Sequence, residues 1–83
     1  MLPPEEKWIK PGTSVWFDEK YLGLGMVIES YCSEDVLRRK ILMYWVHFAA
    51  QDKRFAFVHE RVVNAVKKIE KIKRTRKQNA QSR

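Results

Sequence analysis

The chain has 83 residues, a net charge of +7 and a single cysteine. A chain of this length forms one domain with a small core, which leaves no room for a second substrate domain or a deep cofactor cleft, and one cysteine excludes an internal disulfide and a cysteine-cluster zinc site. No apolar run approaches the roughly 18 residues of a membrane span and no secretory signal pattern opens the chain, so we expect a soluble, intracellular protein, with Cys32 half-buried or in a loop.

The first part of the chain predicts an extension followed by two strands. Residues 1–12 are polar and end in a Pro-Gly turn signal. Residues 13–19 and 23–32 are rich in β-branched and aromatic side chains, which is typical of strands. Glycine inside a strand usually marks a bend or a close approach, so Gly23 and Gly25 are expected to form a corner at the entry to the second strand.

The middle of the chain predicts a second pair of strands. Residues 33–40 are charged and have no strand character, whereas residues 41–50 form the longest apolar run. Both faces of that run are mostly apolar, so the strand is expected to be covered on both faces or strongly curved. Residues 51–54 are predicted as a four-residue hairpin connection, and residues 55–63 as the returning strand.

The period of the apolar residues then changes to that of a helix. A basic amphipathic helix is predicted over residues 64–77, with Asn64 as its cap, followed by a polar tail over residues 78–83. The apolar stripe of this helix steps by four, three and three residues, through Val62, Val66, Ile69 and Ile72.

Short strands followed by one helix predict a mainly β fold: a small five-stranded antiparallel barrel over residues 13–63 and a C-terminal basic α-helix. The stretches "KPGTSVWFDEKYLGLGMVIES" and "YWVHFAAQDKRFAFVHERVV" resemble SH3-like barrels of the Tudor, chromo-barrel, PWWP and KOW group. The piece "LGLGMV" is similar to RapA-type Tudor-like barrels. The resemblance covers roughly residues 10–66 and implies a barrel fold, which hosts many unrelated functions.

The resemblance also implies a possible aromatic cage for methyl-lysine, which binds through cation–π attraction. Two positions where the related families carry an aromatic ring hold Ala49 and Gln51 here, and "GLGM" replaces the Pro-Trp-Trp-Pro motif. Rings that remain available for a cage are Trp16, Tyr21, Phe48 and Phe55.

The positive charge is concentrated at one end of the chain. Residues 1–58 hold eight basic and eight acidic side chains, whereas residues 59–83 hold nine basic and two acidic ones. Such asymmetry favours a polyanion partner, and a solubilising tail is the simpler alternative. The predicted phosphate contacts are Lys67, Lys68, Lys71, Lys73, Arg74, Arg76 and Lys77 on the helix, with Arg38, Arg39 and Lys40 as a second basic cluster.

Three functions remain open, and none is enzymatic. His47 and His59 have no neighbouring triad or metal pattern, so neither a metal nor a cofactor is expected. The first function is nucleic-acid binding within a ribosomal or transcription assembly, with RNA slightly favoured over DNA. Trp45 or Tyr31 would then stack on bases, unless the helix stripe covers Trp45. The second is a chromatin reader that binds a methyl-lysine histone peptide and DNA, and the third is a structural adaptor between proteins. None of the three involves a membrane or a small-molecule substrate.

Overall fold

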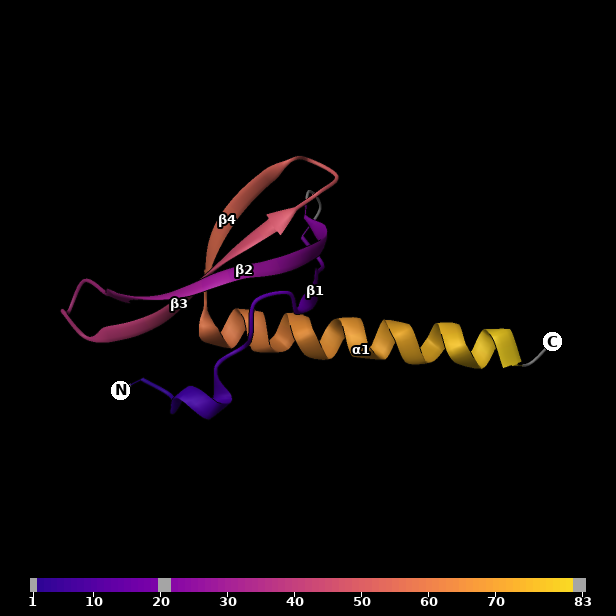
Figure 1. Cartoon of the computed structure of the whole chain (residues 1–83), viewed down its shortest axis with the longest axis horizontal. Coiled ribbons are helices and arrows are strands. Elements are labelled where there is room, and N and C mark those ends of the chain that lie inside the picture. The colour runs from indigo at the N-terminus through magenta and orange to yellow at the C-terminus, as the bar shows by residue number, and fades with distance from the viewer. Residues whose placement is uncertain (1, 20–21, 82–83) are drawn as a thin grey trace.

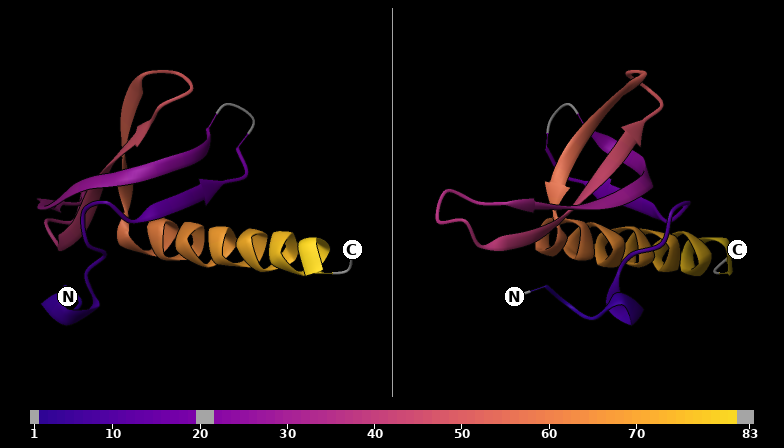
Figure 2. Two further views of the ribbon diagram at one scale, coloured as in Figure 1. Left: turned by 45° about the vertical axis from the view of Figure 1, so that its right-hand side comes forward. Right: turned by 60° about the vertical axis from the view of Figure 1, so that its left-hand side comes forward.

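The computed structural model of the protein describes residues 2–19 and 22–81, with side chains as far as Lys73. The elements are η1 (Glu5–Lys7), β1 (Ser14–Phe17), β2 (Gly23–Glu34), β3 (Lys40–Phe48), β4 (Lys53–Val58) and α1 (His59–Gln81). The four strands form one antiparallel sheet in the order β1-β2-β3-β4. This sheet curls into a half-barrel, with α1 running beneath it (Figures 1 and 2).

A mainly β, antiparallel fold with a C-terminal helix is therefore confirmed. Over the described residues the sheet has four strands, and it does not close into the predicted five-stranded barrel. Residues 59–63, which were predicted to continue the last strand, form the first turns of α1 instead.

The curvature of the sheet comes from a bulge in β2. Val27 pairs with Val46 and Glu29 with Trp45, so Ile28 has no partner in β3. An extra residue of this kind bends its strand and increases the local twist. The bend predicted in this part of the chain exists, but its centre is at Ile28.

The two glycines at the start of β2 have different roles. Gly23 has φ +68° and supplies the turn into the strand, as predicted. Gly25 is buried and has no positive φ, so its prediction as a corner residue is wrong. A Cβ atom at Gly25 would lie 2.8 Å from side-chain atoms of both Val46 and Phe48. Gly25 therefore allows β3 side chains to approach β2 closely.

The core lies between the concave face of the sheet and the first turns of α1. Phe17 stacks on Phe57 with ring centroids 4.3 Å apart and meets Phe48 edge-on at 5.7 Å. From α1, Val62 and Ala65 are buried against this cluster. Burying each large apolar side chain contributes about 1.5–3 kcal/mol, so this single layer supplies most of the stabilisation. The remaining buried side chains from the sheet are Val15, Val27, Leu42, Tyr44 and Val46.

The end of β4 and the start of α1 differ from the prediction because of this packing. Val62 and Val63 are β-branched and favour a strand locally. In the structure Val62, Ala65 and Ile69 are all buried, which is helical spacing on one face. α1 therefore begins at His59, and Asn64 is an exposed residue inside the helix and not its cap.

Two further local predictions are corrected. The β3–β4 connection spans residues 49–52 and not 51–54, and it is closed by Asp52 in a left-handed conformation with φ +52°. Cys32 is exposed on β2 and is neither half-buried nor in a loop.

Tyr44 connects three segments that are distant in sequence. Its hydroxyl accepts a hydrogen bond from the backbone N–H of Ile9 at 3.1 Å and lies 2.8 Å from Nδ1 of His59. The side chain comes from β3 and is fully buried. This contact fixes the N-terminal segment and the first residue of α1 to the centre of the sheet.

Substituting Gly25→Ala is expected to destabilise the protein by about 1–3 kcal/mol, because the new methyl group overpacks a core that has no free space. Urea unfolding measures this loss. Cys32→Ala, at an exposed position of the same strand, is the matched control and should change the free energy of unfolding by less than about 0.5 kcal/mol. Equal stability of Gly25→Ala and wild type would contradict the close approach.

Substituting Tyr44→Phe is expected to cost about 1–3 kcal/mol, because it leaves the Ile9 N–H and the His59 ring without their partner. Burial raises the pKa of Tyr44 above the ordinary 10.0. The folded state therefore keeps its phenolic proton where the unfolded chain loses it, and stability falls as the pH rises past 10. Unfolding measured between pH 7 and 11 should show the advantage of wild type over Tyr44→Phe shrinking at the alkaline end. A constant advantage would contradict this role for Tyr44.

Candidate nucleic-acid interface

The predicted basic helix exists, and its outer part extends past the sheet (Figure 1). α1 has 23 residues, which corresponds to a length of about 35 Å. Ile69 is its last buried residue among the described side chains. Lys67 and Lys71 are exposed one turn apart on the side of the helix opposite Val62 and Ile69. We call α1 from Lys67 onwards its outer part, or the rod. Its exposed lysines make it cationic.

The structure describes the side chains of only some of the other helix residues that were predicted to contact phosphates. Lys68 and Lys73 are exposed. The side chains of Arg74, Arg76 and Lys77 lie outside the described part of the chain.

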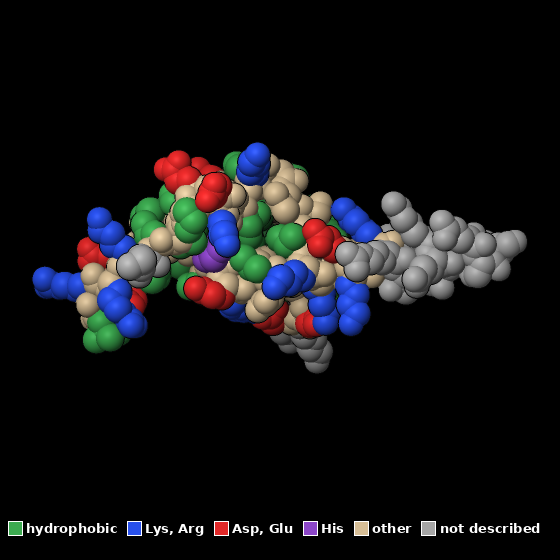
Figure 3. All heavy atoms as spheres, turned by 90° about the horizontal axis from the view of Figure 1, so that it is seen from below, with side chains coloured by type: hydrophobic (Ala, Val, Ile, Leu, Met, Phe, Trp, Pro, Cys, Tyr) green, Lys and Arg blue, Asp and Glu red, His purple; other side chains and the backbone are tan. Residues whose placement is uncertain are grey.

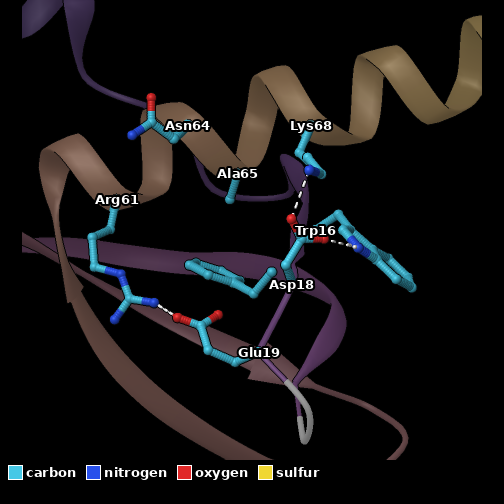
Figure 4. Close-up of a pocket in the computed structure, with 8 residues that line it drawn as sticks. Trp16, Asp18, Glu19, Arg61, Asn64, Ala65 and Lys68 are labelled. Atoms are coloured by element: carbon cyan, nitrogen blue, oxygen red, sulfur yellow. Dashed lines mark hydrogen bonds and ion pairs between the residues drawn. The ribbon is translucent and has the colours of Figure 1, made fainter.

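Two cations on the side of α1 that faces β1 are paired with carboxylates at the end of β1 (Figure 4). Nζ of Lys68 lies 2.6 Å from Oδ2 of Asp18, and Arg61 forms an ion pair with Glu19. The hydrogen bond from Lys68 is the main cause that holds the pKa of Asp18 below its usual range. The charges of Arg61 and Lys68 are therefore neutralised by carboxylates.

These pairs line a shallow groove of about 540 Å³ between β1 and α1. The guanidinium carbon of Arg61 lies 5.1 Å from the ring centroid of Phe57 and 5.6 Å from that of Phe17. Arg61 thus covers the core in addition to pairing with Glu19. The two cations of this groove are paired with carboxylates, and this pairing disfavours phosphate binding there.

The basic surface is discontinuous as a result. Seen from below, blue side chains along α1 alternate with red ones, and a separate group of blue side chains lies at the far left (Figure 3). That group belongs to the hairpin between β2 and β3, which projects from the end of the molecule opposite the C-terminus of α1 (Figure 1).

The second predicted cluster lies at the tip of this hairpin. Arg38, Arg39 and Lys40 are all exposed. Nε of Arg39 lies 2.8 Å from Oδ2 of Asp35, and hydrogen bonds from Arg39 are the main cause that lowers the pKa of Asp35. Arg39 is therefore occupied by an internal pair. The structure does not bring the tip cluster and the helix cluster together.

Trp45 is not covered by the helix stripe, contrary to that alternative. It alternates along β3 with buried Tyr44 and Val46, so it faces the outer side of the sheet, away from α1. There it stacks with Tyr31 at a centroid distance of 5.8 Å, and the guanidinium carbon of Arg54 lies 5.2 Å from its ring.

The predicted aromatic cage does not assemble from the described rings. Phe48 is fully buried in the core, so its ring is not accessible to a peptide. Phe55 is 40% exposed with its ring 6.0 Å from that of Phe48. Trp16 instead donates a hydrogen bond to Asp18 at 3.2 Å. The remaining member, Tyr21, lies outside the described residues.

The two histidines are in separate environments. Nε2 of His47 lies 3.4 Å from Asp52, while His59 contacts Tyr44. Within residues 2–19 and 22–81 no group of three acidic, histidine or cysteine side chains is arranged to hold a metal ion. In the same part of the chain, no helix is both long and apolar enough to cross a membrane.

Two contributors to the charge distribution were not predicted from the sequence. Asp18 and Glu19 end the first predicted strand, over residues 13–19, and they pair with Lys68 and Arg61. Opposite charge was the available signal, but the partners are far apart in sequence and no spacing rule connects them.

Comparisons of the chain with protein-family models, with curated proteins and with solved structures find no significant match.

Proposed function

We propose that the protein is a non-enzymatic nucleic-acid-binding module, acting as a subunit of a ribosomal or transcription assembly. One observation about α1 supports this proposal: the helix extends past the sheet and exposes Lys67, Lys71 and Lys73. The sequence places nine basic and two acidic side chains in residues 59–83. A projecting rod of this charge is suited to a polyanion.

The mechanism is neutralisation of phosphates. Each lysine carries a compact positive charge on a flexible stem, which adapts to the backbone without reading bases. Binding releases condensed counterions, so the affinity falls steeply with salt and depends little on sequence. RNA is favoured slightly over DNA, as the sequence suggested, because a basic helix on a small β domain is a common anchor in structured RNA.

The ion pairs between α1 and the end of β1 limit which part of the helix can contact the nucleic acid. Asp18 and Glu19 repel phosphate and hold Lys68 and Arg61 beside the sheet. The acidic end of β1 thus directs the nucleic acid toward the outer turns of α1. This supports a contact by the side of the rod that faces away from the core.

We also propose that the half-barrel is an open relative of SH3-like barrels. An antiparallel order of consecutive strands, a second strand bent by a bulge and a helix after the last strand support this relation. In this relative the helix takes the place of a closing fifth strand over the concave face. A ligand cage inside the barrel has no space, because Phe48 and its neighbours fill it.

Replacing Lys67, Lys71 and Lys73 together with glutamine is expected to weaken binding to a 20-base-pair RNA duplex by more than about tenfold at 100 mM salt. Three lost phosphate contacts should also reduce the slope of log K against log salt by about two to three. Fluorescence anisotropy over 50 to 300 mM salt measures both quantities.

The matched control replaces Lys7, Lys10 and Lys53, which are exposed lysines elsewhere on the molecule. It removes the same net charge and should lower the affinity by less than about threefold, since long-range effects are screened within about 10 Å at 100 mM salt. An equal loss of affinity in the two triple variants would show that binding depends on net charge and not on the helix. Binding that is unchanged at high salt would instead favour the adaptor function.

Substituting Asp18→Asn is expected to raise the affinity for the same duplex by about two- to fivefold, because it releases Lys68 from an exposed ion pair of modest strength. The same titration measures the change. Glu29→Gln, which removes one negative charge from an exposed position of β2 opposite Trp45, is the control and should have a smaller effect. A reduced affinity of Asp18→Asn would show that the carboxylate supports the contact.

A further inference from the structure

The β2–β3 hairpin projects from the end of the molecule (Figure 1), and two large apolar side chains in its loop are exposed. Val36 is 98% exposed and Leu37 is 68% exposed. Single apolar residues on a surface are ordinary, but these two are adjacent and lie between two acidic and three basic residues. Among the described residues, neither side chain belongs to the hydrophobic core or packs against it.

The tip is held in one conformation by Asp35. Its Oδ1 accepts hydrogen bonds from the backbone N–H groups of Leu37 and Arg39, both at 2.9 Å. The N–H of Arg38 donates to the carbonyl of Asp35 at 2.9 Å, and the N–H of Asp35 donates to the carbonyl of Arg39 at 3.0 Å. Val36 and Leu37 therefore occupy the two central positions of a closed turn. A preformed turn loses little conformational entropy on binding.

Arg38 has a left-handed backbone with φ +60°. A turn followed by one left-handed residue is a common three-residue hairpin loop, and glycine is the least strained residue at that position. An arginine there carries a conformational cost that its own contacts in the fold do not explain. Its exposed side chain is therefore a candidate for contact with a partner.

Charge selects the kind of partner. The carboxylate of Asp35 is engaged by Arg39, which leaves Arg38 and Lys40 as exposed cations beside the apolar pair. Two side chains bury far less area than the roughly 800 Å² per partner of a stable protein interface. An unpaired base has a small apolar face, and the phosphates on either side of it are anionic. Its size and charge therefore match those of the apolar pair and its neighbouring cations. Proteins insert apolar side chains next to bases in this way and thereby unstack them.

We propose that the tip inserts Val36 and Leu37 against an unpaired or weakly stacked base of helical nucleic acid, while Arg38 and Lys40 contact the adjacent phosphates. This inference rests on the proposed function. It adds that the protein prefers nucleic-acid duplexes that contain an unpaired base. The tip and the outer part of α1 lie at opposite ends of a molecule 53 Å long. Cations of both elements are visible from the same side (Figure 3).

The test compares two RNA hairpins with the same stem, one fully paired and one with a single bulged 2-aminopurine. The wild-type protein is expected to prefer the bulged RNA by about tenfold or more, since burying one such side chain supplies at least that factor. It should also raise the 2-aminopurine fluorescence, because unstacking relieves quenching. The double variant Val36→Ser/Leu37→Ser should lose both effects and keep its affinity for the paired stem within about threefold.

The matched control is Leu24→Ser/Met26→Ser, which makes the same polarity change at side chains 56% and 48% exposed on the sheet. It should retain the preference. Equal wild-type affinity for the two RNAs, or an unchanged preference in the tip variant, would overturn the inference. Tip-dependent binding to phosphatidylserine vesicles without a preference for the bulge would overturn it in favour of a membrane surface. The proposed function fails separately, if the paired stem shows no salt-dependent binding at all.

Discussion

The structure depends on the packing of the first turns of α1 against the concave face of the sheet. Four strands supply a single apolar layer, and that layer is covered by one helix face through Val62 and Ala65 beside Phe17. The sheet is shorter than the helix that covers it (Figure 1). Among the described side chains of α1, Ile69 is the last buried one, and Lys71 and Lys73 beyond it are exposed. The separation of a folded body from a charged rod follows from this mismatch in length.

Curvature determines the position of the other projecting element. The bulge at Ile28 bends β2, and the absence of a side chain at Gly25 allows β3 to follow it closely. Beyond the bulge the two strands continue as a hairpin past the edge of the core (Figure 2). Tyr44 fixes the start of α1 to the middle of β3, and the hairpin and the C-terminal end of α1 project at opposite ends of the molecule (Figure 1). Both carry exposed cations: Arg38, Arg39 and Lys40 on the hairpin, and Lys67, Lys71 and Lys73 on the helix.

Features set by local sequence were predicted, and features set by tertiary contacts were not. The apolar run and the change of period located β3 and the helix, because burial imposes those patterns directly. The start of α1 was placed too late, because the β-branched Val62 and Val63 favour a strand until the concave face selects a helix. Phe48 faces the core and Trp45 faces outward because of how β3 pairs with β2 and β4. The sequence of β3 is apolar on both faces, so it does not show which face is buried.

The central claim is that the outer part of α1 and the hairpin tip contact one nucleic acid. Its most direct test is an NMR titration of the isotope-labelled protein with the bulged RNA hairpin. The measured quantity is the change in chemical shift of each backbone amide. We predict shifts concentrated in residues 35–40 and 66–73, with the buried residues of β3 unchanged. Shifts confined to the outer face of the sheet around Tyr31 and Trp45, with none in α1, would contradict the claim.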